Sequence, residues 1–95
     1  MHHIIVTLEQ FRRTMLAEGY NEVIERRWDA NTTVESHTHP FEANALVVEG
    51  EMFLTMQGEK ERRLVAGDRF HIQPNIPHTE RYSQDGATYW VARKN

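Results

Sequence analysis

Three histidines are the side chains of this sequence best suited to chemistry. His37 and His39 form a His-x-His pair, and His78 lies much further along the chain, directly after Pro77. Side chains alternate along a β-strand, so a His-x-His pair on a strand points both imidazoles to the same face. A third imidazole from another strand could complete a three-nitrogen face for one divalent metal ion. The sequence has no cysteine, which leaves histidine and carboxylate as the metal ligands.

Length and charge narrow the classes of protein. The 95 residues favour a single domain, residues 1–95, near the lower end of what buries its own core. Lys and Arg number 11 and Asp and Glu 14, and there is no basic run, so we expect no nucleic-acid partner. No stretch is apolar for the ~18 residues that cross a membrane, and residues 1–6 lack a signal-peptide core. We therefore expect a cytoplasmic protein that does not enter membranes.

The N-terminal segment predicts one short α-helix over about residues 7–18. Thr7 and Gln10 are spaced as a capping box, in which each side chain satisfies a free backbone N–H of the first turn. Phe11 and Met15 fall on one face of this helix, which should pack on a sheet or on a partner subunit.

The rest of the chain, about residues 20–93, reads as short strands separated by turn signals. Asp85-Gly86 is a hairpin signal, because these residue types favour tight turns between strands. Many short strands at this spacing indicate an all-β barrel or sandwich. The expected strands are 22–28, 34–39, 43–48, 52–57, 62–65, 70–72, 79–82 and 88–93.

These segments together resemble the cupin superfamily. Its first motif is roughly G-x5-H-x-H-x3–4-E-x6-G, and here His37 and His39 match the histidine pair and Gly50 the final glycine. Its second motif, G-x5-P-x-G-x2-H-x3-N, is matched by Gly67 at its start and by His78. The resemblance implies a small antiparallel jelly-roll β-barrel of the RmlC-like type, with His37, His39 and His78 binding a metal.

The sequence departs from the family pattern at the fourth ligand. Ala43 occupies the position of the motif's glutamate, and Glu42 is the carboxylate beside it. Regular alternation would point Glu42 outward, whereas a bulge near Pro40 would reverse that, so Glu42 is an open candidate for the fourth ligand. His71 lies between Phe70 and Ile72, whose parity marks the core side, so it should face away from the metal.

Two other departures concern the turns and the end of the second motif. Asn31 and Asn75 stand where the motifs have glycine, and asparagine tolerates the left-handed backbone better than other non-glycine residues. We therefore expect the backbone of both turns to keep its left-handed conformation. Tyr82 replaces the closing asparagine of the second motif.

The ligand types leave the metal open. Imidazole suits zinc, iron, nickel and copper, and an added carboxylate would favour manganese or iron. We expect one divalent metal ion, which can be Fe, Zn, Ni, Mn or Cu. The plainer interpretation is that the histidines are buried polar groups with hydrogen-bond partners, but three at motif positions favour a metal. His2 and His3, near the terminus, are weaker candidates for chelation.

Other candidate site residues follow from parity. Glu80 and Tyr82 share parity with His78, so Glu80 could act as an acid or base and Tyr82 could hydrogen-bond a ligand. The alternative is that they line the barrel and form a salt bridge at its rim. A small, partly apolar ligand is expected in a pocket whose walls are Phe41, Ala43, Ala45, Val47, Tyr82 and Trp90.

Two classes of function fit these features. A metal-dependent enzyme, of dioxygenase or isomerase/lyase-like type, would use the open positions of the metal on a small molecule. A small-molecule-binding or sensing cupin would use the same pocket without turnover. The simplest alternative is a barrel that the metal stabilises and that catalyses no reaction. Strand 52–57 is partly apolar on both faces, which predicts a homodimer.

Overall fold

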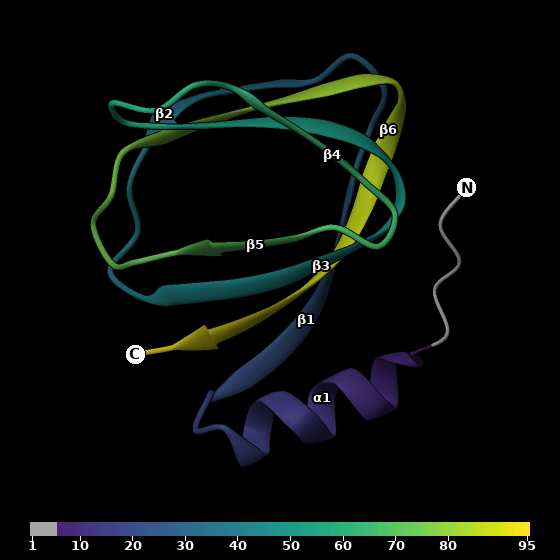
Figure 1. Ribbon diagram of the computed structural model, residues 1–95, viewed down its shortest axis with the longest axis vertical. Coiled ribbons are helices and arrows are strands. Elements are labelled where there is room, and N and C mark those ends of the chain that lie inside the picture. Colours follow the sequence, from purple (N-terminus) through teal and green to yellow (C-terminus); the bar gives the residue numbers. More distant parts are fainter. Residues whose placement is uncertain (1–5) are drawn as a thin grey trace.

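One helix and six strands make up the part of the chain that the structure describes. The computed structural model describes residues 6–95 and leaves residues 1–5, with His2 and His3, outside the description. In chain order the elements are α1 (Leu8–Ala17), β1 (Glu22–Trp28), β2 (Thr33–His37), β3 (Glu42–Met56), β4 (Arg62–Val65), β5 (Arg69–Ile72) and β6 (His78–Lys94) (Figure 1).

The two long strands, β3 and β6, pair with each other in antiparallel fashion and run through both layers of the fold. The first half of β3 also pairs with β5 and the second half with β4, while the first half of β6 pairs with β2 and the second half with β1. The layers are therefore β1–β6–β3–β5 and β2–β6–β3–β4, and Figure 1 shows them facing each other. This antiparallel jelly roll confirms the predicted fold class.

The jelly roll is open rather than a closed barrel. In residues 6–95, β4 and β5 each pair with β3 alone, and β1 and β2 each pair with β6 alone. A gap therefore remains between the outer strands of the two layers, and side chains from β1 and β2 can line a cavity at this edge.

Glycines allow the long strands to bend from one layer into the other. Gly50 has a φ of +82°, and a Cβ atom placed on it would lie 2.1 Å from the carbonyl oxygen of Gly86. Gly86 has a φ of +64°, and a Cβ atom placed on it would lie 2.4 Å from the carbonyl oxygen of Trp28. The hairpin predicted at Asp85-Gly86 is wrong, because β6 continues through these residues and only changes direction there.

Two apolar clusters stabilise the layers. The larger lies between them and includes Met52 and Leu54, both fully buried. The smaller lies on the outer face of the β1–β6–β3–β5 layer, where Phe11 and Met15 of α1 pack against Trp90. Figure 1 shows α1 lying beneath this layer. The apolar face predicted for the helix therefore packs on a sheet of its own chain.

Local signals in the sequence are confirmed at the start of the helix and at two turns. Thr7 and Gln10 form the predicted capping box. Asn31 and Asn75 have φ of 58° and 64°, the left-handed conformation expected where the family motifs have glycine. The Asn75 N–H also donates to the His39 carbonyl oxygen at 2.8 Å, so the second motif's turn is tied to the first motif.

The outer face of the β2–β6–β3–β4 layer is less apolar than the sequence suggested. Met52 and Leu54 turn inward, and the ring of Phe53 on the other face is covered by the Arg81 guanidinium at 3.9 Å. The homodimer therefore stays a prediction. No helix within residues 6–95 has the length and apolar character needed to cross a membrane.

Candidate metal centre

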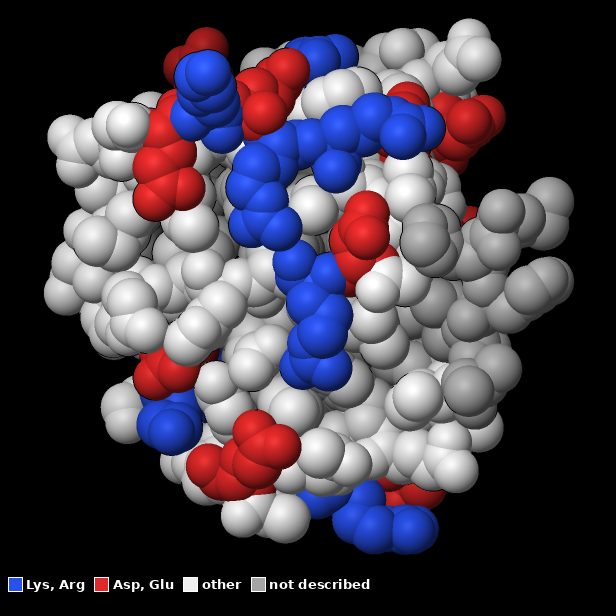
Figure 2. Space-filling view, in the orientation of Figure 1, with Lys and Arg blue, Asp and Glu red and all other residues white. Residues whose placement is uncertain are grey.

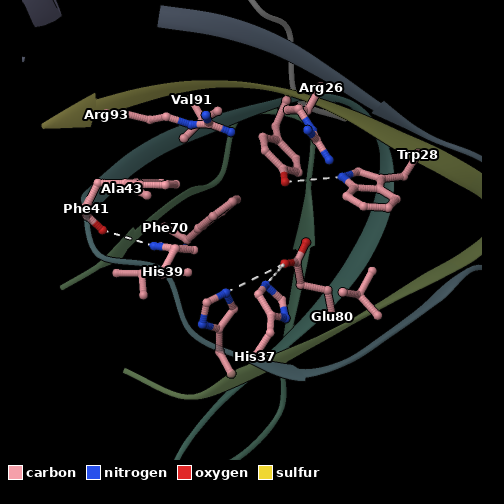
Figure 3. A pocket seen from close by; sticks show the side chains of 14 residues that line it. Arg26, Trp28, His37, His39, Phe41, Ala43, Phe70, Glu80, Val91 and Arg93 are labelled. Carbon is pink, nitrogen blue, oxygen red and sulfur yellow. Dashed lines mark hydrogen bonds and ion pairs between the residues drawn. The ribbon is translucent and has the colours of Figure 1, made fainter. Parts of the chain in front are cut away.

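Two of the three predicted histidines meet at the edge where β2 pairs with β6. His37 and His78 are direct partners in the register of these strands, and their ring centroids lie 4.2 Å apart. Glu80 follows His78 by two residues and therefore points to the same face. One ligand atom from each of His37, His78 and Glu80 lies within 4.8 Å of the others. Figure 3 shows the His37 imidazole pointing at the Glu80 carboxylate.

Backbone carbonyls fix which nitrogen each imidazole offers. Nδ1 of His37 lies 2.9 Å from the carbonyl oxygen of Glu35, and Nδ1 of His78 lies 2.9 Å from that of Ile76. A carbonyl oxygen can only accept a hydrogen bond, so Nδ1 carries the proton in both rings. In the neutral imidazole Nε2 then has a free lone pair, which is the arrangement found in metal-ligating histidines.

The donor spacing fits a metal ion. Nε2 of His37 and Nε2 of His78 lie 3.6 Å and 3.7 Å from Oε2 of Glu80. Donors bound at ~2.0–2.2 Å to one ion stand about 3.0–3.5 Å apart, so both nitrogen–oxygen distances are near those of a bound set. The two Nε2 atoms lie within 4.8 Å of each other and would have to move closer. Two imidazoles and one carboxylate are the ligand set of many non-haem Fe(II) sites, which keep positions open for other molecules.

Tyr82 holds the carboxylate of this cluster in place. Its hydroxyl donates a hydrogen bond to Oε1 of Glu80, which leaves Oε2 facing the imidazoles. Burial, and next the nearby Tyr89 and Glu80, raise the pKa of Tyr82, so its hydroxyl stays protonated as a donor. Its ring stacks on Trp28 with centroids 5.3 Å apart. Tyr82 does not line the cavity beside the cluster, and it acts on the site through Glu80.

His39 lies beside the cluster rather than in it. Its ring centroid is 5.0 Å from that of His78 and 6.2 Å from that of His37, and it stacks on Phe41 at 4.2 Å. The expected alternation fails because β2 ends at His37, so His39 belongs to the loop before β3. Burial lowers the pKa of His39. Its imidazole is therefore neutral at pH 7 and available at the cavity wall.

Glu42 lies on the other face of the β1–β6–β3–β5 layer, away from the three histidines of the predicted site. Its carboxylate accepts hydrogen bonds from the Tyr20 hydroxyl at 3.0 Å and from Nε2 of His71 at 2.5 Å. Glu42 does not line the cavity and so is not placed as a fourth ligand. Both Glu42 and His71 point where regular alternation places them.

This outer network gives stability a pH dependence. The hydrogen bonds from His71 and then Tyr20 lower the pKa of Glu42. A carboxyl whose pKa is lower in the folded state stabilises the fold above its unfolded pKa, and this stabilisation is lost as the pH falls through the folded pKa. We expect Glu42→Gln to lower the free energy of unfolding at pH 7, with the difference shrinking as the pH falls below the ordinary glutamate pKa of about 4.3.

Urea denaturation of both proteins across this range measures the effect, with Glu59→Gln, an exposed carboxylate of the turn after β3, as the control. A difference between wild type and Glu42→Gln that grew as the pH fell would contradict the assignment.

A cavity of about 300 Å³ opens beside the cluster of His37, His78 and Glu80. Of the predicted wall residues, Phe41 and Ala43 line it. Ala45 and Val47 are fully buried between the layers, and Trp90 lies on the α1 side, where its Nε1 donates to Glu25 at 3.0 Å. The wall residues that the sequence analysis missed are Arg26, Trp28, Val34, Phe70, Ile72, Tyr89, Val91 and Arg93.

For two of the missed wall residues, the sequence shows that they share one face of a strand. Arg26 and Trp28 alternate on β1, a strand whose bounds the sequence predicts correctly. What the sequence does not reveal is that this face of β1 turns to the histidines, because that depends on the pairing of β1 with the second half of β6.

Solved structures share this fold. The first is a structure of the DMSP lyases RdDddP and RnDddQII, with a TM-score of 0.73 and 20% identity over 78% of this chain. The DMSP lyase DddQ from Ruegeria pomeroyi DSS-3 has a TM-score of 0.68 and 26% identity over 77% of this chain. An RmlC-like cupin from Shewanella frigidimarina NCIMB 400 has a TM-score of 0.67 and 23% identity over 78% of it.

The chain spans 38%, 36% and 66% of the length of these three proteins, respectively. No curated protein matches it. The family model described as "Cupin domain" matches residues 26–92, which include both layers of the jelly roll and every residue of the metal cluster. The chain therefore belongs to the cupin family.

Proposed function

We propose that this chain binds one divalent metal ion through His37, His78 and Glu80 and acts as a metal-dependent enzyme on a small molecule. The observation that carries the proposal is the convergence of two Nε2 atoms and one carboxylate oxygen at the wall of a cavity. The ligand set favours Fe or Mn, with Zn, Ni and Cu as further candidates. The ion would supply Lewis-acid or O₂ chemistry at its open positions.

The protein's own groups divide the remaining work. Glu80 and the two imidazoles hold the ion, and the Tyr82 hydroxyl keeps the carboxylate turned toward them. His39 is the titratable side chain of the cavity wall best placed to accept a proton, because Nδ1 donates to the Phe41 carbonyl oxygen and leaves Nε2 free. Rotation of the same ring would make it a fourth ligand instead.

Two kinds of reaction fit this arrangement. The two-histidine, one-carboxylate set favours an oxygenase. A lyase is supported by the 26% identity to the protein named as the DMSP lyase DddQ, and by a neutral imidazole in the cavity wall, since elimination needs a base.

Anaerobic reconstitution with Fe(II) tests the proposal. Oxygen uptake is then followed with small enol, thiol and catechol compounds, and loss of DMSP is followed in a parallel assay. We expect consumption of at least one compound that requires the metal and is abolished in Glu80→Gln. Tight binding of a compound without consumption would instead support a sensing module, and failure to bind any metal would refute the proposal.

A further inference from the structure

We propose that the cavity recognises the carboxylate of a small ligand through Arg26 and Arg93, on the wall facing the metal cluster. The inference rests on the proposed function for the metal-bound end of the ligand, whereas the arginine end stands on its own observations. Figure 3 shows both arginines on the side of the cavity across from His37 and Glu80. Figure 2 shows Lys and Arg side chains in a band over one face of the molecule. Arg26 and Arg93 are the two arginines that line the cavity.

Arg26 has a free guanidinium in the cavity. It lies two residues before Trp28 on β1 and shares its inward face, with Cζ 4.9 Å from the centre of the Trp28 ring. The indole is itself held, because its Nε1 donates to the Tyr89 hydroxyl at 3.2 Å. Among residues 6–95 no carboxylate lies within ion-pair distance of Arg26. An arginine positioned on an aromatic ring, with its hydrogen-bond donors unused, is prepared to bind an anion.

Arg93 has a buried donor without an acceptor. Its guanidinium lies over the Phe41 ring at 4.6 Å, and one of its terminal nitrogens is 3.5 Å from the Glu22 carboxylate at the exposed rim. Its Nε is buried and has no hydrogen-bond partner among the described residues. Buried polar groups are almost always paired, so the Arg93 guanidinium is not fully satisfied by the described part of its own chain.

The charges of the cavity wall favour an anion. Two arginines and one glutamate line it, and in the proposed site the Glu80 charge is matched to the metal. A neutral ligand would leave the Arg26 guanidinium in the cavity without a counter-charge. Carboxylates fit the planar fork of arginine with two parallel hydrogen bonds. The wall between the two ends is apolar, with Val91, Ile72 and Phe70, so the ligand should have a short apolar body.

Binding of butyrate to the metal-free protein isolates the arginine end. The sequence has two tryptophans, so in a Trp90→Phe background the fluorescence of Trp28, in the cavity wall, reports binding directly. We expect butyrate to bind and its neutral isostere butyramide to bind at least about tenfold more weakly. Arg26→Gln and Arg93→Gln should each weaken butyrate binding by about tenfold or more. Arg27→Gln, the next residue of β1 and exposed, is the matched control and should leave it unchanged.

Further variants and ligands test how the carboxylate is recognised. Arg93→Lys keeps the charge but loses the fork, so intermediate binding supports bidentate recognition even if the glutamine variant folds poorly. Equal binding of butyrate and butyramide, or equal effects of Arg27→Gln and Arg93→Gln, would overturn the inference. Tighter binding of inorganic phosphate than of butyrate would overturn the assignment to a carboxylate. Zinc titration of the same samples separates the two proposals, since zinc binding without butyrate binding refutes only this one.

Discussion

Replacing His78 with alanine is expected to lower the affinity for zinc or Fe(II) by at least ~100-fold, because it removes the most buried ligand of the cluster. Only 1% of the His78 side chain is exposed to solvent. The affinity is measured by competition with a coloured chelator. His2→Ala/His3→Ala serves as the background for every variant, so that imidazoles near the terminus do not contribute to the signal.

The same titration compares how much metal affinity is lost when other residues of the proposed site are replaced. Glu80→Gln should lose as much affinity as His78→Ala, while Tyr82→Phe, which removes only the hydrogen bond to Oε1, should lose about 10–100-fold. His71→Ala is the matched control, because this histidine lies on the outer face and contacts Glu42. Unchanged affinity in His78→Ala, or a loss in Glu42→Gln as large as that in Glu80→Gln, would contradict the assigned ligands.

Gly50→Ala is expected to destabilise the fold by about 4 kcal/mol or more. The new Cβ would lie 2.1 Å from the Gly86 carbonyl oxygen and 2.8 Å from the Ala87 Cα, and both are backbone atoms in the bend of β6. Neither can move without separating the two long strands. The residue would also have to keep a φ of +82°, which non-glycine residues rarely adopt.

Gly58→Ala is the matched control for that substitution. Gly58 has nearly the same φ, +80°, but a Cβ there meets nothing within 4 Å. Its cost should therefore be the backbone strain alone, about 1–2 kcal/mol. Urea denaturation followed by circular dichroism compares the two variants. Equal losses of stability would show that the close approach of β3 and β6 at this bend does not matter to the fold.

The elements that depend on local sequence could be predicted, and those that depend on the path of the long strands could not. The bounds of β1 and β4 agree with the sequence analysis, and so does the capping box of α1. The hairpin at Asp85-Gly86 was predicted from residue types that favour turns. The same glycine also suits a bend inside a continuous strand, and only the pairing with β3 decides between the two.

The bend also explains why Trp90 does not line the cavity. His78, Glu80 and Tyr82 face inward in the first half of β6, whereas Tyr89 and Arg93 face inward in the second half. The parity of inward residues therefore changes between the halves. Trp90, which was expected in the pocket, shares the parity of His78, but after the bend this parity points to α1. Parity arguments hold within one regular strand and fail across an irregularity.

The grouping of His37, His78 and Glu80 was predicted only in part, because it also depends on irregularities in the strands. His37 and His78 both lie in strands, and their convergence follows from the family motifs. His39 lies past the end of β2, where alternation no longer applies. Glu80 was identified as an inward carboxylate, but as an acid or base rather than a ligand. Its closeness to His37 depends on the β2–β6 register, which includes an irregularity between Val34 and His37 and is not readable from the sequence.

A crystal structure of the metal-loaded protein, with anomalous diffraction recorded at the absorption edge of the bound metal, tests the central claim most directly. We predict one ion bound by Nε2 of His37, Nε2 of His78 and Oε2 of Glu80, with at least one position open toward the cavity. An ion held by Glu42 and His71 on the outer face, or a cluster that stays without metal at saturating concentration, would contradict it.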